Sequence, residues 1–166
     1  MAGSMKAVKL RIKSVQSTMQ ITKAMQLVAA SKLRKAKERA DASKPYLENM
    51  LLTLTDIANS NTDFQSPYTK ATESDKWLYV VIAGDRGLAG GYNSNLFKFM
   101  EQETKGRGDF TVLPIGKKSV EHFKHRNVPL FTEEYAEIAK VTLSDCFQVA
   151  KLICNAYSSG EYGHIY

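Results

Sequence analysis

The sequence predicts an α/β protein in which a long N-terminal coiled-coil helix precedes a small domain built on a parallel sheet. Residues 6–58 contain no glycine and one proline, Pro45, a composition typical of a continuous helix. Farther along the chain, short apolar runs rich in β-branched residues alternate with segments of helical periodicity. We therefore expect three regions: a long helix over 1–60, a connector over 61–75 and an α/β domain over 76–166.

The long helix has an apolar seam. About 53 residues of helix are roughly 80 Å long at 1.5 Å per residue. Steps that alternate between four and three residues from Val8 reach fifteen positions, and twelve of them are apolar. Such a heptad pattern requires a partner helix, because side chains left in water forfeit most of the free energy of burial. The seam positions on which this prediction depends are Val8, Ile12, Val15, Met19, Leu33, Ala36, Leu47, Met50, Leu54 and Ile57.

Pro45 leaves two interpretations of this helix open. The seam passes Pro45 without a change of register, which favours a single helix that bends there. Alternatively, Ser43 caps a separate second helix that starts near Pro45.

The middle and the charge of the helix both indicate a partner. Residues 24–30, AMQLVAA, are apolar nearly all round, which indicates enclosure from several sides; the alternative is a helix that crosses the core of its own domain. Residues 1–44 hold eleven Lys or Arg and two acids, whereas the rest of the chain carries a net charge of −3. This asymmetry predicts a negatively charged partner, which could be nucleic acid, an anionic membrane or an acidic protein surface.

The basic segment also permits two different interpretations. Residues 32–39 could form a solvated helix face supported by the i,i+4 ion pairs Arg34–Glu38 and Lys37–Asp41. The first 37 residues contain no acid and would also suit a mitochondrial transit peptide. The helical pattern continues beyond the point where such a segment would be cleaved, which favours the long helix.

The region after the connector has the β–α–β–α order of a small Rossmann-like domain. WLYVVIA at 77–83 is typical of a buried strand, and Thr142 with Asp145 forms the T-x-x-D pattern that caps a helix. The start of another strand at 163–166 suggests a domain cut short at its C-terminal end. The remaining expected elements are a glycine-rich loop at 84–93, helices to about residue 105 and over 117–126, and strands over 110–115 and 129–131.

No motif for catalysis or cofactor binding is found. The loop GDRGLAGGYN matches neither G-x-G-x-x-G nor the P-loop pattern, so we expect its glycines to serve turns and close packing. His122 and His125 share a helix face without a further ligand at metal-binding spacing, which indicates surface histidines. Cys146 and Cys154 lie in one helix about 12 Å apart, too far for a disulfide. We therefore expect no cofactor, no metal and no catalysis by this chain itself.

Two segments resemble the gamma subunits of F-type ATP synthases. Residues 5–40 resemble the first helix of that family, notably in I-x-S-V-x-S-T, I-T-K-A-M and V-A-A-S-K-L-R-K-A. GDRGLAGGYN resembles the family's glycine-rich loop after the first strand of its α/β domain. The two matches occur in the family's order and separation, and looser similarity extends over all 166 residues.

The resemblance implies a central-stalk rotor subunit that couples proton flow through the membrane sector to ATP synthesis or hydrolysis. In that family, the first helix pairs with the C-terminal helix as an antiparallel coiled coil inside the ring of alpha and beta subunits, which hold the ATP chemistry. The α/β domain meets the epsilon subunit and the membrane rotor ring. Residues that match the family's ring-contact segment are Ile21, Thr22, Lys23, Ala24, Met25, Val28, Ala29, Ser31, Lys32, Leu33, Arg34 and Lys35.

The resemblance further implies a peripheral membrane protein on the cytoplasmic face of a bacterial inner membrane, with the mitochondrial matrix face as the alternative. The longest apolar run, at 77–83, is shorter than the roughly 20 residues that span a bilayer. Because the family's C-terminal helix is missing from this sequence, we expect an exposed seam and self-association.

Two function classes compete with this interpretation. Composition alone permits a basic-helix nucleic-acid-binding protein, but the aromatic residues that could stack on bases lie outside residues 1–44. A small nucleotide-binding α/β enzyme would need a phosphate-binding loop that GDRGLAGGYN does not match.

Overall fold

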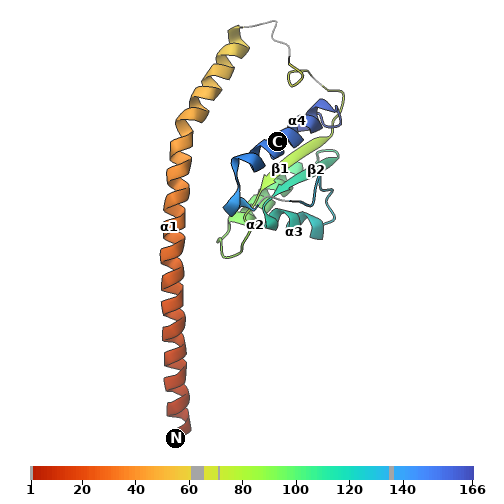
Figure 1. Cartoon of the computed structure of the whole chain (residues 1–166). Coiled ribbons are helices and arrows are strands. Elements are labelled where there is room, and N and C mark those ends of the chain that lie inside the picture. The colour runs from red at the N-terminus through yellow and green to blue at the C-terminus, as the bar shows by residue number, and fades with distance from the viewer. Residues whose placement is uncertain (1, 61–65, 71, 135–136) are drawn as a thin grey trace. The chain divides into compact units, whose positions relative to one another are not determined.

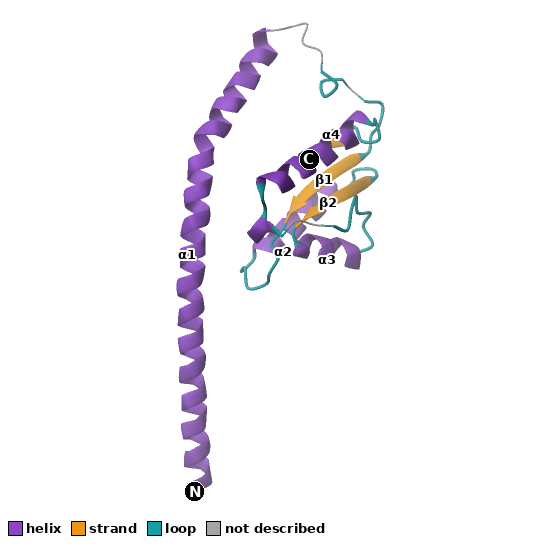
Figure 2. Cartoon of the chain, in the orientation of Figure 1, coloured by secondary structure: helices purple, strands orange, loops and turns teal. Residues whose placement is uncertain are grey.

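The protein divides into two compact units, residues 1–64 and 65–166. The computed structural model describes residues 2–60, 66–70, 72–134 and 137–166. The first unit is the helix α1, Ala2–Ser60, and the second contains a parallel sheet with helices (Figure 1 and Figure 2). This architecture confirms the predicted α/β class. Of the predicted connector 61–75, residues 61–65 and 71 lie outside the described residues.

Helix α1 is continuous over 59 residues and includes Pro45 in its interior. The alternative of a separate helix starting near Pro45 is therefore wrong. Proline removes one backbone hydrogen bond and crowds the preceding turn, which bends a helix without ending it. Several hydroxyl groups bond within the helix itself; Thr18 and Thr22, for example, donate to the carbonyls of Ser14 and Thr18. Every side chain from residue 4 to residue 60 is exposed.

The sheet of the second unit has the strand order β2-β1-β3, and both pairings are parallel. Strand β1, Trp77–Ile82, lies in the middle and pairs along its whole length with β2, Phe110–Ile115. Strand β3, His164–Ile165, pairs only with Trp77 and Leu78.

The strand predicted over 129–131 is wrong. In its place a single bridge joins Leu130 to Val112, through hydrogen bonds from Val112 N to Pro129 O and from Phe131 N to Val112 O. Pro129 has no N–H with which to extend the ladder.

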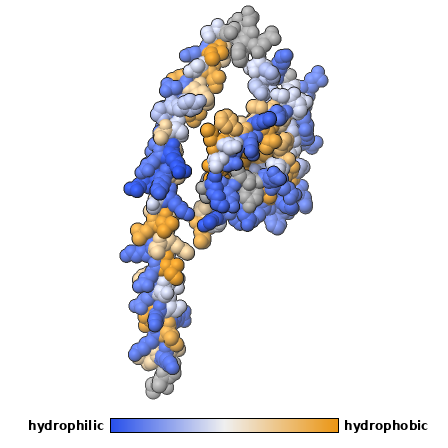
Figure 3. All heavy atoms as spheres, viewed as in Figure 1, coloured by the Kyte–Doolittle hydropathy of each residue, from blue (hydrophilic) through white to orange (hydrophobic). Residues whose placement is uncertain are grey.

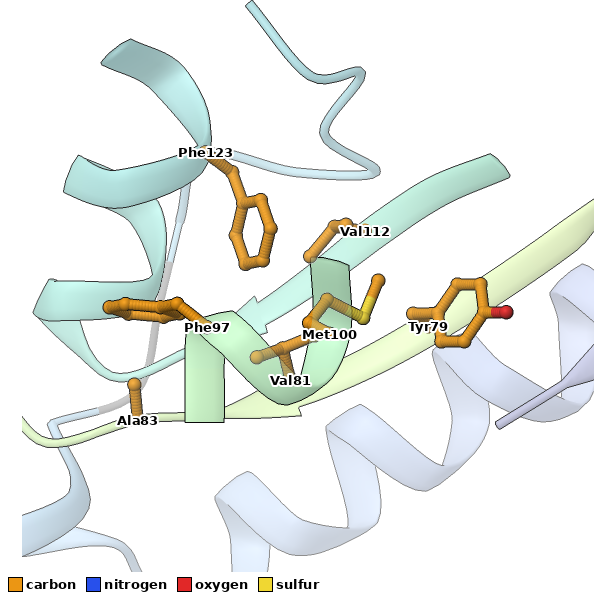
Figure 4. Close-up of a cluster of buried hydrophobic side chains, with 7 residues drawn as sticks. All are labelled: Tyr79, Val81, Ala83, Phe97, Met100, Val112 and Phe123. Carbon is orange, nitrogen blue, oxygen red and sulfur yellow. The ribbon is translucent and has the colours of Figure 1, made fainter. Parts of the chain in front are cut away.

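Helices cover both faces of the sheet. On one face, α2 (Tyr92–Thr104) and α3 (Lys117–His125) pack over the strands. On the other face, α4 (Leu143–Ser158) packs with Tyr162 against Leu78 and Leu113. Successive residues of β1 point to opposite faces, as the period of two requires. The cluster under α2 and α3, shown in Figure 4, consists of Tyr79, Val81, Ala83, Phe97, Met100, Val112 and Phe123.

The predicted cap of α4 is confirmed. Thr142 Oγ1 accepts a hydrogen bond from Asp145 N at 3.3 Å, and Thr142 N donates to Asp145 Oδ2 at 2.8 Å. The hydrogen bonds from Thr142 hold the pKa of the Asp145 carboxyl below its ordinary value. A short 3₁₀ helix, η1 (Ile138–Lys140), precedes the cap.

Two glycines permit close backbone approaches that position β1. Gly116 has φ +87°, and a Cβ there would lie 2.0 Å from the carbonyl oxygen of Ala83. A Cβ on Gly163 would lie 1.7 Å from the carbonyl oxygen of Ser74. Because non-bonded carbon and oxygen atoms cannot approach so closely, any other residue at these positions must shift the backbone.

Candidate functional site on the long helix

All the site residues predicted from the sequence lie on α1 and are exposed. The ten seam residues include large side chains such as Val15 and Leu33, which are 60% and 70% exposed. Helical geometry places the ten at the a and d positions of successive heptads, with Val8 at d and Ile12 at a. Side chains at these positions form one stripe along the helix. The stripe has no covering element among the described residues, since all of its members are exposed.

The segment from Met19 to Leu33 differs from the rest of α1. In addition to the a and d positions, large apolar residues occupy b, g and c, where Leu27, Met25 and Val28 are 67%, 63% and 56% exposed. A helix that is apolar all round is stable in water only when it is enclosed. On the face visible in Figure 3, apolar atoms of α1 gather here and toward the end of the helix, with a hydrophilic segment between them.

Leu27 is a residue that the family resemblance missed, because the matched motifs do not include it. Leu27 can be recognised from the sequence because residues 24–30 are apolar nearly all round the helix. Sequence reasoning also missed Leu88 in the glycine-rich loop, which is fully exposed with φ 59°. On α4 it missed Leu143 and Phe147, which are 73% and 67% exposed.

The basic surface of α1 is only partly neutralised within the helix. Its described residues form two ion pairs, Arg34–Glu38 at 3.6 Å, as predicted, and Lys44–Glu48 at 3.8 Å. The predicted pair Lys37–Asp41 does not form within 4.0 Å in this part of the structure. Both pairs are highly exposed and of the type that contributes little to stability. The basic groups of α1 before Arg34 therefore remain available to an external negative charge.

The glycine-rich loop after β1 is tied to α3. Asp85 Oδ1 accepts a hydrogen bond from Lys117 N at 3.1 Å, and Gly84 O accepts one from Lys118 N at 3.0 Å. These donors are the first two free N–H groups of α3, the place at which a helix N-terminus would bind a phosphate. A side chain of the protein already occupies that place, so the loop acts as a helix cap. This arrangement accounts for the lack of a phosphate-binding motif in the loop.

Two hollows lie at this end of the sheet, where β1 and β2 end. A polar hollow is lined by Gly84, Asp85, Arg86, Lys117, Glu137, Ile138 and Lys140. Within it, Lys140 pairs with Glu137 at 2.8 Å, which raises the pKa of the Lys140 amine. An apolar hollow lies between the ends of β1 and β2 and the start of α4, and Ile82, Ile138 and Val141 on its wall are partly exposed. No arrangement for nucleophilic or acid–base catalysis joins these residues.

His122 differs from the prediction that both histidines lie on the surface. It is half-buried and stacks on Phe97 with ring centroids 3.7 Å apart. Its Nε2 lies 2.6 Å from Arg126 Nη1, and Arg126 also pairs with Glu101. Burial, and then the Arg126 charge, lower the pKa of His122. Within the described part of the chain, no three His, Cys, Asp or Glu residues are grouped as metal ligands.

Two further observations bear on the chemistry of the chain. Cys146 and Cys154 are both in α4 and both are free, which confirms that they do not form a disulfide. Among the described helices, none is both long enough and apolar enough to cross a bilayer.

Comparisons with known proteins identify what this chain resembles. The sequence model of the ATP synthase family matches residues 4–166. The chain is 44% identical to the ATP synthase gamma chain of Ruminococcus albus over 165 residues, which cover 96% of this chain and 57% of that relative. It is 37% identical to the ATP synthase gamma chain of Lachnoclostridium phytofermentans, with 99% and 56% covered. It is 34% identical to the sodium-ion-specific ATP synthase gamma chain of Acetobacterium woodii, with 100% and 55% covered.

The chain thus spans little more than half the length of these relatives. None of these matches supports the nucleic-acid alternative.

Proposed function

The chain belongs to the ATP synthase gamma-chain family, and from this premise we propose that it contributes the shaft helix of a rotary ATP synthase. In this role α1 turns inside the ring of alpha and beta subunits and couples ion flow through the membrane sector to ATP synthesis or hydrolysis. The chain itself is non-catalytic, and the chemistry occurs in the beta subunits.

The observation that carries this proposal is the exposed apolar surface around the middle of α1. Residues 19–33 present large apolar side chains at the a, b, c and g positions, and Met25, Leu27 and Val28 are each more than half exposed. Burying a side chain of this kind is worth about 1.5–3 kcal/mol, so an enclosing protein collar would stabilise the segment strongly. A single partner helix would cover mainly the a and d stripe.

We assign the contact with the ring to the positions that match the family segment. They combine apolar side chains, such as Ile21, Met25 and Val28, with the cations Lys32, Arg34 and Lys35, so they suit an apolar collar beside acidic groups. The remaining proposed contacts in this segment are Thr22, Lys23, Ala24, Ala29, Ser31 and Leu33.

The remaining partners follow from the same family premise. The a and d seam packs against the family's C-terminal helix in an antiparallel coiled coil. The α/β unit contacts the epsilon subunit and the membrane rotor ring, which keeps the protein at the membrane surface. The expected location is the cytoplasmic face of a bacterial inner membrane. Partly exposed apolar residues of the α/β unit, including Phe147 of α4, are compatible with such contacts.

The ring contact can be tested by assembly with purified alpha and beta subunits of the same source. We expect the chain to co-elute with an alpha–beta complex in size-exclusion chromatography. Val28→Glu, which puts a charge into the collar segment, should weaken this association at least tenfold. Leu52→Glu is the matched control, because Leu52 is similarly exposed on α1, at 63% against 56%, but lies outside the proposed contact. No association, or equal loss in both variants, would contradict the proposal.

A further inference from the structure

The described part of the connector between α1 and β1 is folded onto the α/β unit. The polar sequence of residues 61–75 is typical of a linker. Residues 66–70 and 72–76, which we call the strap, nevertheless bond to the C-terminal end of α4 and to the turn after it, before the chain enters β1 (Figure 2). The bonded residues are 85 to 87 positions apart in the sequence, so these contacts are tertiary.

The first attachment joins the end of the strap to the turn between α4 and β3. Ser74 Oγ donates a hydrogen bond to Glu161 O at 2.7 Å, and Lys76 Nζ pairs with Glu161 Oε1 at 2.7 Å. The Lys76 ammonium also lies 4.8 Å from the centroid of the Tyr162 ring. Gly163 permits the close approach of its backbone to Ser74. These contacts fix the strap where it enters the sheet.

The second attachment holds the beginning of the strap on the last turns of α4. The Tyr157 hydroxyl donates a hydrogen bond to Lys70 O at 2.9 Å. The ring of Tyr68 packs beside the ring of Tyr157, with centroids 6.3 Å apart. Hydrogen bonding with the side chain of Cys154, one turn earlier on α4, raises the pKa of the Tyr68 hydroxyl. Two aromatic side chains therefore hold this part of the strap.

Hydrogen bonds within the strap shape it for the second attachment. Thr69 N–H and Thr69 Oγ1 both donate to Ser66 O, at 3.1 and 3.0 Å. Ser66 N–H donates to Thr69 Oγ1, and Tyr68 N–H donates to Ser66 Oγ. Pro67 occupies the second position of this turn, where its fixed φ is favourable. A turn that is ordered before it docks loses less conformational entropy on docking.

The second attachment shortens the free chain between α1 and the α/β unit. Without the strap, the chain from the end of α1 at Ser60 to the start of β1 at Trp77 could span about 60 Å when extended. From Ser60 to Ser66, the first residue of the strap, it can span only about 20 Å. The attachment on α4 thus reduces the reach of the chain about threefold.

We propose that residues 66–70 and 72–76 are an anchoring strap that fixes, on α4, the point from which the chain leads to α1, with Tyr68 and Tyr157 as its positioning residues. In a shaft subunit, this anchor limits the slack between the shaft helix and the unit that carries it. The inference goes beyond the rotor proposal and does not rest on it, because every contact that supports it lies within the α/β unit.

Limited trypsin digestion of the 166-residue chain tests the second attachment. Trypsin cleaves after Lys70, and the carbonyl oxygen of Lys70 is the acceptor of the Tyr157 hydroxyl. Cleavage requires release of the strap, so its rate follows the population of the released form. We expect Tyr157→Phe to raise the rate of cleavage at Lys70 about fivefold, because one hydrogen bond is lost. Mass spectrometry measures this rate against cleavage at Arg39 on α1.

Tyr92→Phe is the matched control for this digestion. It also removes a tyrosine hydroxyl that donates to a backbone carbonyl, that of Ile82, at 3.1 Å. We expect the Tyr92→Phe variant to be cleaved at Lys70 as slowly as the unmodified chain. Equal acceleration in both variants, or no acceleration by Tyr157→Phe, would overturn the proposal.

The reactivity of Cys154 tests the position of Tyr68. Cys154 is half-buried, whereas Cys146 on the same helix is exposed, and both thiols are free. We expect Tyr68→Ala to raise the rate at which Cys154 reacts with 5,5′-dithiobis(2-nitrobenzoate) at least fivefold and to leave the rate of Cys146 unchanged. Tyr68→Phe keeps the ring and should have a smaller effect. An unchanged rate at Cys154 in Tyr68→Ala, or an equal rise at both cysteines, would overturn the assigned role of Tyr68.

The slack itself is measured by electron–electron distance spectroscopy. Nitroxide labels are attached to an Asp56→Cys variant on α1 and to Cys146 on α4, in a Cys154→Ser background that keeps a hydrogen-bonding side chain beside Tyr68. Dilution with unlabelled chain removes contributions from neighbouring molecules. We expect the distance distribution to broaden when Tyr68→Ala and Tyr157→Phe are combined, because release of the strap lengthens the free chain.

An unchanged width in the combined variant would show that the strap does not restrict α1 and would overturn the proposal. The midpoint of urea unfolding, followed by Trp77 fluorescence, verifies that each variant keeps the folded α/β unit. None of these experiments contains an alpha or beta subunit. Their failure therefore leaves the ring-assembly result unaffected, and failure of ring assembly leaves the strap unaffected.

Discussion

His122 illustrates how the environment of a single residue decides its chemistry. Two histidines three positions apart on one short helix look equivalent in the sequence. The structure separates them: His122 stacks on Phe97, whereas His125 is exposed. The difference arises because Phe97 and Glu101 belong to α2, more than twenty residues away, and no local pattern reveals which helix face meets α2. The sequence argued against a metal site, but it did not reveal the packing of His122.

The depressed pKa of His122 predicts a pH-dependent stability of the α/β unit. Burial, the first cause, and the Arg126 charge favour neutral imidazole in the folded state, while the unfolded chain has the ordinary pKa of about 6.5. The unfolded state therefore binds more protons below about pH 6.5, so stability falls as pH falls through this window. Protonation also removes the Nε2 lone pair that faces Arg126. We expect a lower urea midpoint at about pH 5.5 than at about pH 7.5, followed by Trp77 fluorescence.

The variant that checks this assignment is His122→Gln, which should lose most of the difference between the two pH values. His125→Gln is the control and should retain it. The carboxyls with lowered pKa, Glu121, Asp145 and Glu161, titrate at lower pH and contribute little in this window. A pH difference that survives His122→Gln unchanged would exclude His122 as its source.

At the scale of the elements, local patterns predicted most of the structure. The strand 110–115 begins and ends where it was expected, and the T-x-x-D motif forms the cap of α4. Both depend on signals within a few residues: a β-branched apolar run and a capping box. The features that the sequence did not predict depend on contacts between residues far apart in the chain. Whether residues 129–131 form a strand depended on their pairing with β2, and the role of the glycine-rich loop depended on α3.

The cap that Asp85 provides to α3 predicts a specific loss of stability. Its carboxylate accepts the Lys117 N–H from 32 residues away, at the positive end of the helix dipole. The N-cap position itself is Gly116, which has no side chain to bond the first turn. We expect Asp85→Ala to lower the free energy of unfolding of the α/β unit by about 1 kcal/mol, the usual cost of losing a helix cap.

Urea unfolding followed by Trp77 fluorescence measures this loss, and Asp85→Asn should retain most of the stability, because its amide oxygen can still accept the Lys117 N–H. Asp75→Ala, an exposed aspartate before β1, is the control for the loss of one negative charge. Equal effects of Asp85→Ala and Asp75→Ala would show that charge, and not the cap, is responsible.

For the whole molecule, the sequence predicted two parts of different character, and the structure divides between residues 64 and 65. The α/β unit has its own apolar clusters on both faces of the sheet. Helix α1 has none, because every described side chain from residue 4 onward is exposed. The heptad pattern could be seen in the sequence because it repeats locally. The helix that covers the seam could not be identified from the sequence, because a heptad repeat does not specify its partner.

This division predicts that the two units unfold in separate transitions. Isolated helices are marginal in water, so the helicity of α1 depends on a covering partner, whereas the α/β unit depends on its own core. Far-UV circular dichroism reports mainly on α1, which has 59 helical residues against 13, 9 and 16 in α2, α3 and α4. Fluorescence reports on the α/β unit, because the single tryptophan, Trp77, lies in β1 beneath the Arg107 guanidinium.

In thermal unfolding of this 166-residue chain, we expect the circular dichroism midpoint to rise with protein concentration, since self-association through the exposed seam stabilises α1 by mass action. The fluorescence midpoint should stay constant, because no residue of the α/β core takes part in the seam. The seam variant Leu54→Asp should lower the first midpoint and leave the second unchanged. Coincident transitions at all concentrations would mean that α1 and the α/β unit fold as one cooperative body, in which case the uncovered seam could not be the main determinant of how this chain assembles.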